Sequence, residues 1–197
     1  MVSRVAVLGA GSWGTTVAAL LAPVVSTVLW ARRTELADDL NAGRGNERYL
    51  PGFDLPADLE ATADLGEATS DADLVLVAVP TRGFRAVLEG SSATLGAAVP
   101  VVSLAKGFER GSCLRMTEVV SEVLPGRPVA VLTGPNLAKE VLEGRSSAAV
   151  VAANDSAVPG VLQGLLASDR LRIYTNADLV GCEIGGAVKN VIALAAG

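Results

Sequence analysis

The sequence predicts an α/β fold with a doubly wound, mostly parallel sheet. Two patterns lead to this prediction: short apolar runs alternate with longer helical stretches, and the runs are continuously apolar instead of alternating apolar with polar residues. Continuous apolar runs are typical of strands buried on both faces, and their alternation with helices is typical of βαβ units. The composition agrees, because half of the residues are hydrophobic, 19% are charged and 4% are aromatic. Such a chain can bury a large core of small apolar side chains.

Seven runs have the length of a strand, are rich in Val, Ile or Leu, and end at residues that favour turns. They are residues 4–8, 27–30, 74–79, 100–104, 129–132, 148–152 and 170–174. Between them lie stretches long enough for crossover helices, namely residues 13–21, 81–95, 113–124 and 158–167. Residues 44–56 are the least regular stretch, and we expect a surface connection there.

The last segment, residues 178–197, has a long helical pattern that is apolar nearly all round. A helix that is hydrophobic on every side is normally buried among other elements. We therefore predict one domain over residues 1–177 and the start of a second, helical domain over residues 178–197. The apolar face of this helix predicts a packing partner, either the rest of that second domain or another subunit, as in a homodimer.

The composition also excludes several classes of function. The formal net charge of −5 argues against a nucleic-acid binder that works through a broad basic surface. Two cysteines, Cys113 and Cys182, and no histidine leave too few ligands for a zinc site, so we expect no metal and predict that both cysteines are small buried apolar residues. The N-terminus has neither the plan of a signal peptide nor an apolar stretch that spans a bilayer. A cytoplasmic protein without a membrane span is expected.

The first predicted strand runs into a glycine-rich turn, Gly9-Ala10-Gly11-Ser12-Trp13-Gly14, that opens a helix. A G-x-G-x-x-G pattern alone could be an ordinary tight turn, but a strand before it and a helix after it are typical of dinucleotide binding. The first Gly permits the turn, the second lets a pyrophosphate approach the backbone, and the third lets helix and strand pack closely. The predicted fold is therefore Rossmann-like.

The second strand ends at Ala31-Arg32-Arg33, where an acidic residue would bind the ribose 2′-hydroxyl of NAD. Two guanidinium groups at this place can pair with a 2′-phosphate, which favours NADP, with NAD as the alternative. The other interpretation is that these arginines cover the face of the adenine ring.

Lysine usage points to candidate catalytic residues. A chain without histidine needs another group to exchange the proton of an alcohol, and only three of its 16 basic residues, Lys106, Lys139 and Lys189, are lysines. Lysine can lose its proton when it is desolvated or lies near another cation, whereas arginine cannot. Lys106 follows a strand, at the edge where ligands bind in open α/β sheets. Lys189 lies in the apolar last helix, and Lys139 is predicted to be a solvated charge on a short polar helix.

For Lys189 the alternative is a core lysine that extends its charge to water or pairs with a carboxylate. Positions 185 and 193, one helical turn away, are Gly and Ala and offer no such partner. A further candidate is the turn Thr133-Gly134-Pro135-Asn136, whose backbone N–H groups could bind an anion or a substrate oxygen. An ordinary strand-to-helix turn explains this segment equally well.

Together these segments resemble the bacterial NAD(P)-dependent glycerol-3-phosphate dehydrogenases. The matching segments are GAGSWGT at 9–15, NERYLPG at 46–52, VP at 79–80, AKGFE at 105–109, GPNLAKEV at 134–141 and RIYTNADLVGCEIGGAVKNVIALAAG at 172–197. The resemblance implies that the cofactor is lined by Ser12, Trp13, Arg32, Arg33, Tyr49, Lys106 and Ala138. It implies that the substrate is bound by Lys106, Gly134, Asn136, Lys189 and Asn190, with Lys189 as the proton acceptor. The implied reaction interconverts glycerol 3-phosphate and dihydroxyacetone phosphate and supplies glycerophospholipid synthesis.

Members of that family continue into a helical domain that completes the substrate site with an Asp and an Arg-Asn pair, and this sequence ends before them. We therefore expect these residues alone to bind cofactor but to turn over glycerol 3-phosphate poorly. Two alternatives stay open. One is a dehydrogenase of the β-hydroxyacid and 6-phosphogluconate type, which also places a lysine on a helix after the dinucleotide domain. The other is a non-catalytic NAD(P)-binding module.

Overall fold

The computed structural model describes residues 2–197, and within them eight strands form one sheet in the order β3-β2-β1-β4-β5-β6-β7-β8. The strands are β1 Arg4–Leu8, β2 Ser26–Trp30, β3 Leu59–Thr62, β4 Leu74–Val77, β5 Val101–Ser103, β6 Val129–Thr133, β7 Ser147–Ala153 and β8 Leu171–Asn176. The helices are α1 Ser12–Leu21, α2 Thr34–Asn41, α3 Leu65–Thr69, α4 Thr81–Ser91, α5 Met116–Val123, α6 Ala138–Leu142, α7 Ala157–Leu166 and α8 Leu179–Ala196.

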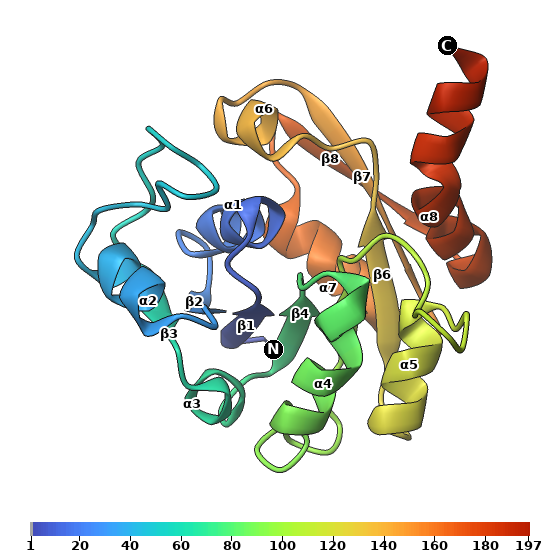
Figure 1. Ribbon diagram of the computed structural model, residues 1–197, viewed down its shortest axis with the longest axis horizontal. Helices are drawn as coiled ribbons and strands as arrows, with labels where there is room; N and C mark the ends of the chain where they lie inside the picture. The colour runs from blue at the N-terminus through green and yellow to red at the C-terminus, as the bar shows by residue number, and fades with distance from the viewer. Residues whose placement is uncertain (1) are drawn as a thin grey trace.

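The sheet is mostly parallel, as predicted. All neighbouring strands pair in parallel except β6 and β7, which run antiparallel with Thr133 opposite Val150. Helices cover both faces (Figure 1), so the doubly wound α/β fold is confirmed. Because β1, β2, β4, β5 and β6 share one direction, their carboxyl ends meet at one edge of the sheet, which we call the carboxyl rim.

Successive side chains of a strand point to opposite faces, and β1 shows how this divides the core. Val5 and Val7 belong to the apolar cluster beneath α1, α2 and α7, whereas Ala6 and Leu8 belong to the cluster beneath α3, α4 and α5. All four side chains are fully buried. Burial on both faces explains the continuous apolar runs from which the strands were predicted.

The predicted strands lie within two residues of the observed ones, but β3 was not predicted. This strand forms the edge of the sheet and pairs with β2 alone. Leu59 and Ala61 are buried while Glu60 between them is exposed. An edge strand with one covered face lacks the continuous apolarity that marks the central strands.

The prediction that both cysteines are buried needs correction. Cys113 is exposed, because α5 begins only at Met116 and Cys113 lies in the turn before it, with a φ of 60°. Cys182 is half-buried on α8.

Residues 44–56 contain no helix or strand, as expected, but the segment is anchored to the core: the buried Asn46 side chain donates hydrogen bonds to the carbonyl oxygen of Ala10 at 3.1 Å and to the hydroxyl oxygen of Thr15 at 2.8 Å.

Helix α8 begins after Asp178, whose carboxylate accepts a hydrogen bond of 2.8 Å from the backbone N–H of Gly181. The helix packs against β6 and β7 along one side only (Figure 1), and Val191, Ile192 and Leu194 are 67%, 59% and 85% exposed. Length and mean hydropathy alone would allow α8 to cross a membrane, but a single helix of this kind is weak evidence for a span. Its buried residue, Glu183, is charged and contacts α5.

Candidate active site

The glycine turn between β1 and α1 has the geometry that its sequence predicts. Gly9 has a φ of +119°, and a Cβ there would lie 2.9 Å from the Val79 side chain. A Cβ on Gly14 would lie 2.0 Å from the carbonyl oxygen of Gly9, so only glycine allows α1 to pack this closely on the turn. A Cβ on Gly11 would meet nothing within 4 Å, which leaves open space above the turn and the N-terminus of α1. This space is suited to a diphosphate.

A cavity of about 660 Å³ lies over this turn, a volume in the range of small-molecule sites. Its lining comes from the carboxyl ends of β1, β2 and β4 and from the elements that follow them. The residues are Gly9, Ala10, Gly11, Ser12, Trp13, Trp30, Arg32, Arg33, Leu36, Tyr49, Ala78, Val79, Pro80, Arg82, Gly83 and Val87. Three arginines and no acidic residue line the cavity, so its charge suits an anionic ligand.

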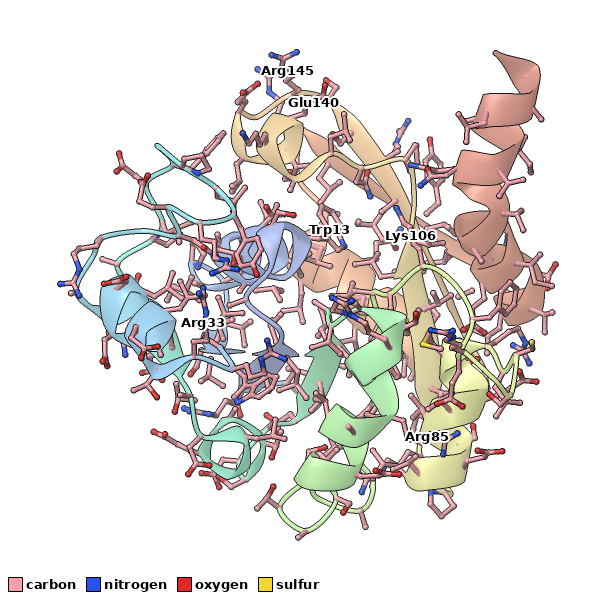
Figure 2. All side chains as sticks on the ribbon, in the orientation of Figure 1. Trp13, Arg33, Arg85, Lys106, Glu140 and Arg145 are labelled. Carbon is pink, nitrogen blue, oxygen red and sulfur yellow. The ribbon has the colours of Figure 1, made fainter. Side chains whose placement is uncertain are left out.

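Two of these arginines, Arg32 and Arg33, follow β2, and Arg33 is also the N-cap residue of α2 (labelled in Figure 2). Within residues 2–197 neither has an ion-pair partner. The third, Arg82 in the first turn of α4, was not predicted. It is exposed and has no ion-pair partner in the described part of the chain. Its place just after the strand-ending Val79-Pro80 was the signal that could have identified it.

The remaining candidates for cofactor binding lie beside the turn. Tyr49 is 42% exposed in the cavity wall, and the Arg48 guanidinium carbon lies 5.6 Å from the centre of its ring. Ala138 begins α6, where its carbonyl oxygen accepts a hydrogen bond of 3.5 Å from the Thr16 hydroxyl on α1. Ala138 does not belong to the cavity lining, and Lys106 does not either.

Lys106 follows β5 at the carboxyl rim and faces the turn after β6 (Figure 2). Its ammonium group donates a hydrogen bond of 2.6 Å to the carbonyl oxygen of Gly134. Burial lowers the pKa of Lys106, and repulsion by the Lys189 ammonium lowers it further. Two of the three lysines thus lie near enough for their charges to interact. The third, Lys139 on α6, is exposed, as predicted.

Helix α8 reaches Lys106 through Gly186. A Cβ on Gly186 would lie 2.5 Å from the Thr133 hydroxyl oxygen and 3.8 Å from Cγ of Lys106, so glycine permits this close approach. Lys189 lies three residues later on the same side of the helix and is half-buried. The helix that carries Lys189 thus meets Lys106 at the carboxyl rim, beside the turn after β6.

The β6 turn contributes polar groups that have no partner. Within residues 2–197, the buried hydroxyl of Thr133 has no hydrogen-bond partner, and the buried Oδ1 of Asn136 accepts no hydrogen bond. A Cβ on Gly134 would lie 2.8 Å from the carbonyl oxygen of Ala148, so this turn is packed tightly against β7. Asn190, the residue after Lys189 on α8, is exposed.

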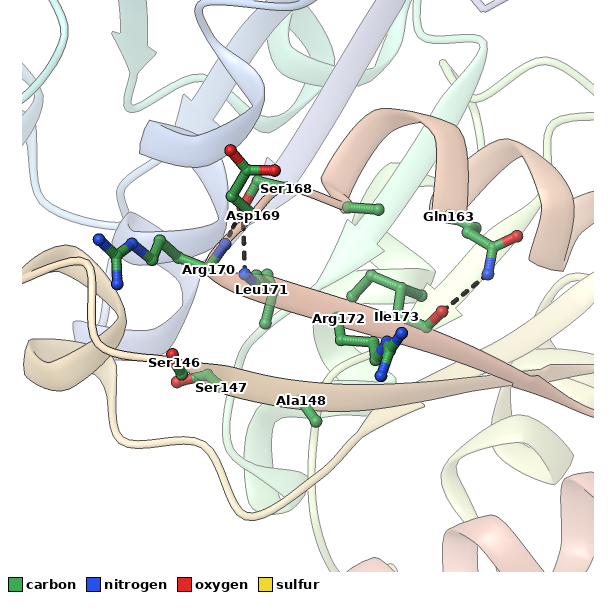
Figure 3. A pocket seen from close by; sticks show the side chains of 11 residues that line it. Ser146, Ser147, Ala148, Gln163, Ser168, Asp169, Arg170, Leu171, Arg172 and Ile173 are labelled. Atoms are coloured by element: carbon green, nitrogen blue, oxygen red, sulfur yellow. Dashed lines mark hydrogen bonds between the residues drawn. The ribbon is translucent and has the colours of Figure 1, made fainter.

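A larger cavity, of about 770 Å³, lies elsewhere, on the α7 side of β7 and β8 (Figure 3). Its hydrogen-bonding side chains are satisfied by neighbours: Gln163 donates to the carbonyl oxygen of Ile173 at 2.7 Å, and the Ser168 hydroxyl oxygen accepts from the backbone of Leu171 at 3.1 Å. It contains no buried charged side chain. Its size alone gives no reason to place a ligand there, and the described residues hold no cluster of metal ligands.

The residues around the glycine turn fit NAD(P). The open space at Gly11, the free N-terminus of α1 and the three arginines match an anionic dinucleotide, and the two lysines beside the β6 turn are suited to proton exchange. Fold and site together define the cofactor-binding domain of an NAD(P)-dependent dehydrogenase.

Comparisons with known proteins specify the family. Residues 4–158 match the family model described as NAD-dependent glycerol-3-phosphate dehydrogenase N-terminus, and the chain belongs to this family. It is 48% identical over 194 residues to a glycerol-3-phosphate dehydrogenase [NAD(P)+] of Sphingopyxis alaskensis and 49% identical over 199 residues to that of Thermobifida fusca. These matches cover 98% and 99% of this chain but 58% and 59% of the relatives.

Solved structures agree. The glycerol-3-phosphate dehydrogenase of Coxiella burnetii superimposes with a TM-score of 0.92 at 35% identity, covering 98% of this chain and 59% of that one. That of Plasmodium falciparum gives a TM-score of 0.92 at 26% identity, covering 98% and 57%. The chain thus spans somewhat more than half the length of the proteins it matches.

Proposed function

We propose that the protein interconverts glycerol 3-phosphate and dihydroxyacetone phosphate by hydride transfer with NAD(P), in the service of glycerophospholipid synthesis. The observation that carries this proposal is the close approach of α8, the helix that bears Lys189, to Lys106 and Thr133 at the carboxyl rim, the same edge of the sheet as the cofactor cavity. The dinucleotide, when bound, accepts or supplies the hydride. The chain itself must orient the substrate and exchange the hydroxyl proton.

In this proposal Lys189 exchanges the proton of the substrate hydroxyl. Oxidation of a secondary alcohol releases a proton from its hydroxyl oxygen as the hydride leaves the carbon, and the neutral amine of Lys189 accepts it; reduction returns it. Lys106 keeps its hydrogen bond to Gly134 and presents positive charge to the substrate oxygens. The unpartnered Asn136 amide and the backbone around Gly134 supply further polar contacts, and Asn190 extends the substrate side.

NADP is the proposed cofactor, because Arg32 and Arg33 line the cavity without an acidic residue and without ion-pair partners among the described residues. In this proposal Ser12, Trp13 and Tyr49 of the cavity lining also contact the cofactor. Ala138 on α6 contacts it from outside that lining. We assign residues 1–177 to the cofactor domain and residues 178–197 to the start of a second domain, which the exposed apolar face of α8 supports. The same face suits a second subunit, and a cytoplasmic location is proposed with the activity.

A chimera tests the proposal. Residues 1–197 replace the matching segment of the Thermobifida fusca relative, with which they align over 199 residues. The chimera should reduce dihydroxyacetone phosphate with NADPH, and Lys189→Met should lower kcat by about 10²–10⁴-fold. Lys189→Arg should fail equally, because a guanidinium keeps the charge but cannot release its proton. Lys139→Met, on the exposed lysine of α6, is the matched control and should leave kcat unchanged.

Two outcomes would contradict the proposal. Turnover of β-hydroxyacids or 6-phosphogluconate in preference to glycerol 3-phosphate would favour the related dehydrogenase class. NADPH binding without any turnover by the chimera would favour a non-catalytic module.

A further inference from the structure

Glu183 is the one charged side chain among the buried residues of the described chain, at 8% exposure. It lies in the second turn of α8, away from the cofactor cavity, and the proposed reaction does not use it. Burial of a carboxylate is costly unless hydrogen bonds and a counter-charge compensate for lost water. Its position therefore requires an explanation.

The Glu183 carboxylate is fully engaged at the start of α5. It accepts a hydrogen bond of 3.0 Å from the backbone N–H of Thr117 and another from the Thr117 hydroxyl. The Arg115 guanidinium donates a charged hydrogen bond of 2.8 Å to it. A negative charge at the N-terminus of α5 is also favoured by the helix dipole. These contacts fasten the second turn of α8 to α5.

Arg115 also closes the loop that starts at Lys106. Its backbone forms an isolated β-bridge with Phe108, and the N–H of Glu109 donates a hydrogen bond of 2.8 Å to the carbonyl oxygen of Leu114. These two contacts join the two ends of the loop from Lys106 to Arg115. One guanidinium connects the loop that carries Lys106 to the helix that carries Lys189.

Along α8, Glu183, Gly186 and Lys189 are spaced by three residues, so Gly186 neighbours both Glu183 and Lys189 on the helix surface. Gly186 contacts Thr133 and Lys106, whereas the residues beyond Lys189 are exposed. The contact of Glu183 with Arg115 and Thr117 is the polar anchor on this side before the helix reaches the rim. Without it, the approach of Lys189 to Lys106 would depend on the small apolar contacts of α8 alone.

We propose that Glu183 is a positioning residue: by binding Arg115 and Thr117 it fixes α8 on α5 and holds Lys189 beside Lys106. The placement of the two lysines follows from contacts within this chain. The consequence for catalysis rests on the proposed function, in which Lys189 exchanges the substrate proton.

Lysine titration in the 197-residue chain tests the placement. With three lysines, the side-chain signals of labelled lysine can be assigned from single Lys→Met variants and followed against pH by NMR. In Glu183→Gln, α8 should loosen, and the depressed pKa of Lys106 should rise toward its usual value, because burial and repulsion by Lys189 both weaken. Gly186→Ala, which drives α8 away from Thr133, should shift Lys106 in the same direction.

Glu118→Gln is the matched control, because Glu118 binds the same guanidinium at 2.7 Å and, in the described chain, forms its side-chain hydrogen bond and ion pair with Arg115 and not with α8. It should leave the Lys106 titration as in the wild type. NADPH binding, in the cavity over β1, β2 and β4, should survive in all three variants and reports that the fold is intact. Equal Lys106 titrations in Glu183→Gln and wild type, or loss of NADPH binding in Glu183→Gln, would overturn the positioning role.

The same variant in the chimera separates this inference from the proposed function. Glu183→Gln should lower kcat while leaving KM for NADPH unchanged, and Glu183→Asp should restore part of the loss. An unaltered kcat in Glu183→Gln would contradict the inference. A chimera without activity in its wild-type form would count against the proposed function, while the lysine titration would still decide the placement.

Discussion

Arg85 on α4 holds the Glu109 carboxylate in a two-pronged pair, with N–O distances of 2.8 and 2.9 Å. The same guanidinium reaches Glu122 on α5 at 2.7 Å, so it joins α4, α5 and the loop that begins at Lys106 (Figure 2 labels Arg85 and Lys106). Arg85 lowers the pKa of Glu109 to about 2, with help from a hydrogen bond donated by Ser112. The pair therefore links the site loop to the acid stability of the protein.

Because the folded pKa of Glu109 lies below its usual value of 4.5, the folded state favours the charged carboxylate. The resulting stability is fully present above about pH 4.5 and is lost as the pH falls toward 2. Glu109→Gln should thus lower the free energy of unfolding at pH 7, and the difference from wild type should shrink between pH 4.5 and 2. Urea unfolding across this range measures it. Glu143→Gln, which removes an exposed pair with Arg145, is the control with little expected effect.

The glycine turn predicts two different outcomes for similar substitutions. Gly14→Ala places a Cβ 2.0 Å from the Gly9 carbonyl oxygen and should destabilise the fold by about 1–3 kcal/mol or more. Gly11→Ala meets no protein atom and should cost about 1 kcal/mol or less, as expected for an N-cap change. Its methyl group instead occupies the space proposed for the diphosphate, so NADH and NADPH should both bind more weakly. Urea unfolding together with cofactor titration separates the two; unchanged cofactor affinity in Gly11→Ala would place the diphosphate elsewhere.

Arg32 and Arg33 should select the 2′-phosphate. The double variant Arg32→Ala with Arg33→Ala should weaken NADPH binding by about 10–100-fold, the range expected for charge-assisted hydrogen bonds, while NADH binding changes little. Equilibrium titration at fixed salt measures both, and Arg170→Ala, on an exposed arginine at the larger cavity, is the control. Equal affinities for the two cofactors in the wild type would remove the basis for NADP preference.

Arg82 should act on the diphosphate, because it approaches the glycine turn from the β4 side while Arg32 and Arg33 approach from the β2 side. With β1 between them, β2 and β4 are about 10 Å apart. Arg82→Ala should weaken NADH and NADPH binding by a similar factor, about tenfold. ADP, which carries the diphosphate, should lose more affinity than 2′,5′-ADP, which keeps only one of these two phosphates. A loss confined to NADPH and 2′,5′-ADP would assign Arg82 to the 2′-phosphate instead.

The sequence was sufficient to predict the central strands and the glycine turn, because both depend on local patterns: continuous apolarity and glycines at fixed spacing. The antiparallel pairing of β7 was not predictable in the same way, because a run buried on both faces reads alike in either direction. Arg82 and Asn46 escaped prediction because their roles depend on which loops the fold brings beside the turn. Glu183 lay within a segment that reads as apolar, and its partners are more than 60 residues away in sequence.

The direction of β7 decides which edge of the sheet Lys189 reaches. Because β7 runs opposite to β6 and β8 runs parallel to β7, β8 runs away from the carboxyl rim and ends at Asn176, level with Val131 of β6. Helix α8 therefore starts away from the rim and runs back toward it beside β6 (Figure 1). From Leu179 to Gly186, which meets Thr133 at the end of β6, the helix advances about 10 Å, and Lys189 lies about 4.5 Å further along its axis. Because β7 reverses the chain direction, α8 runs toward the proposed reacting groups and carries the amine of Lys189 there. Without this reversal, the helix would run away from them.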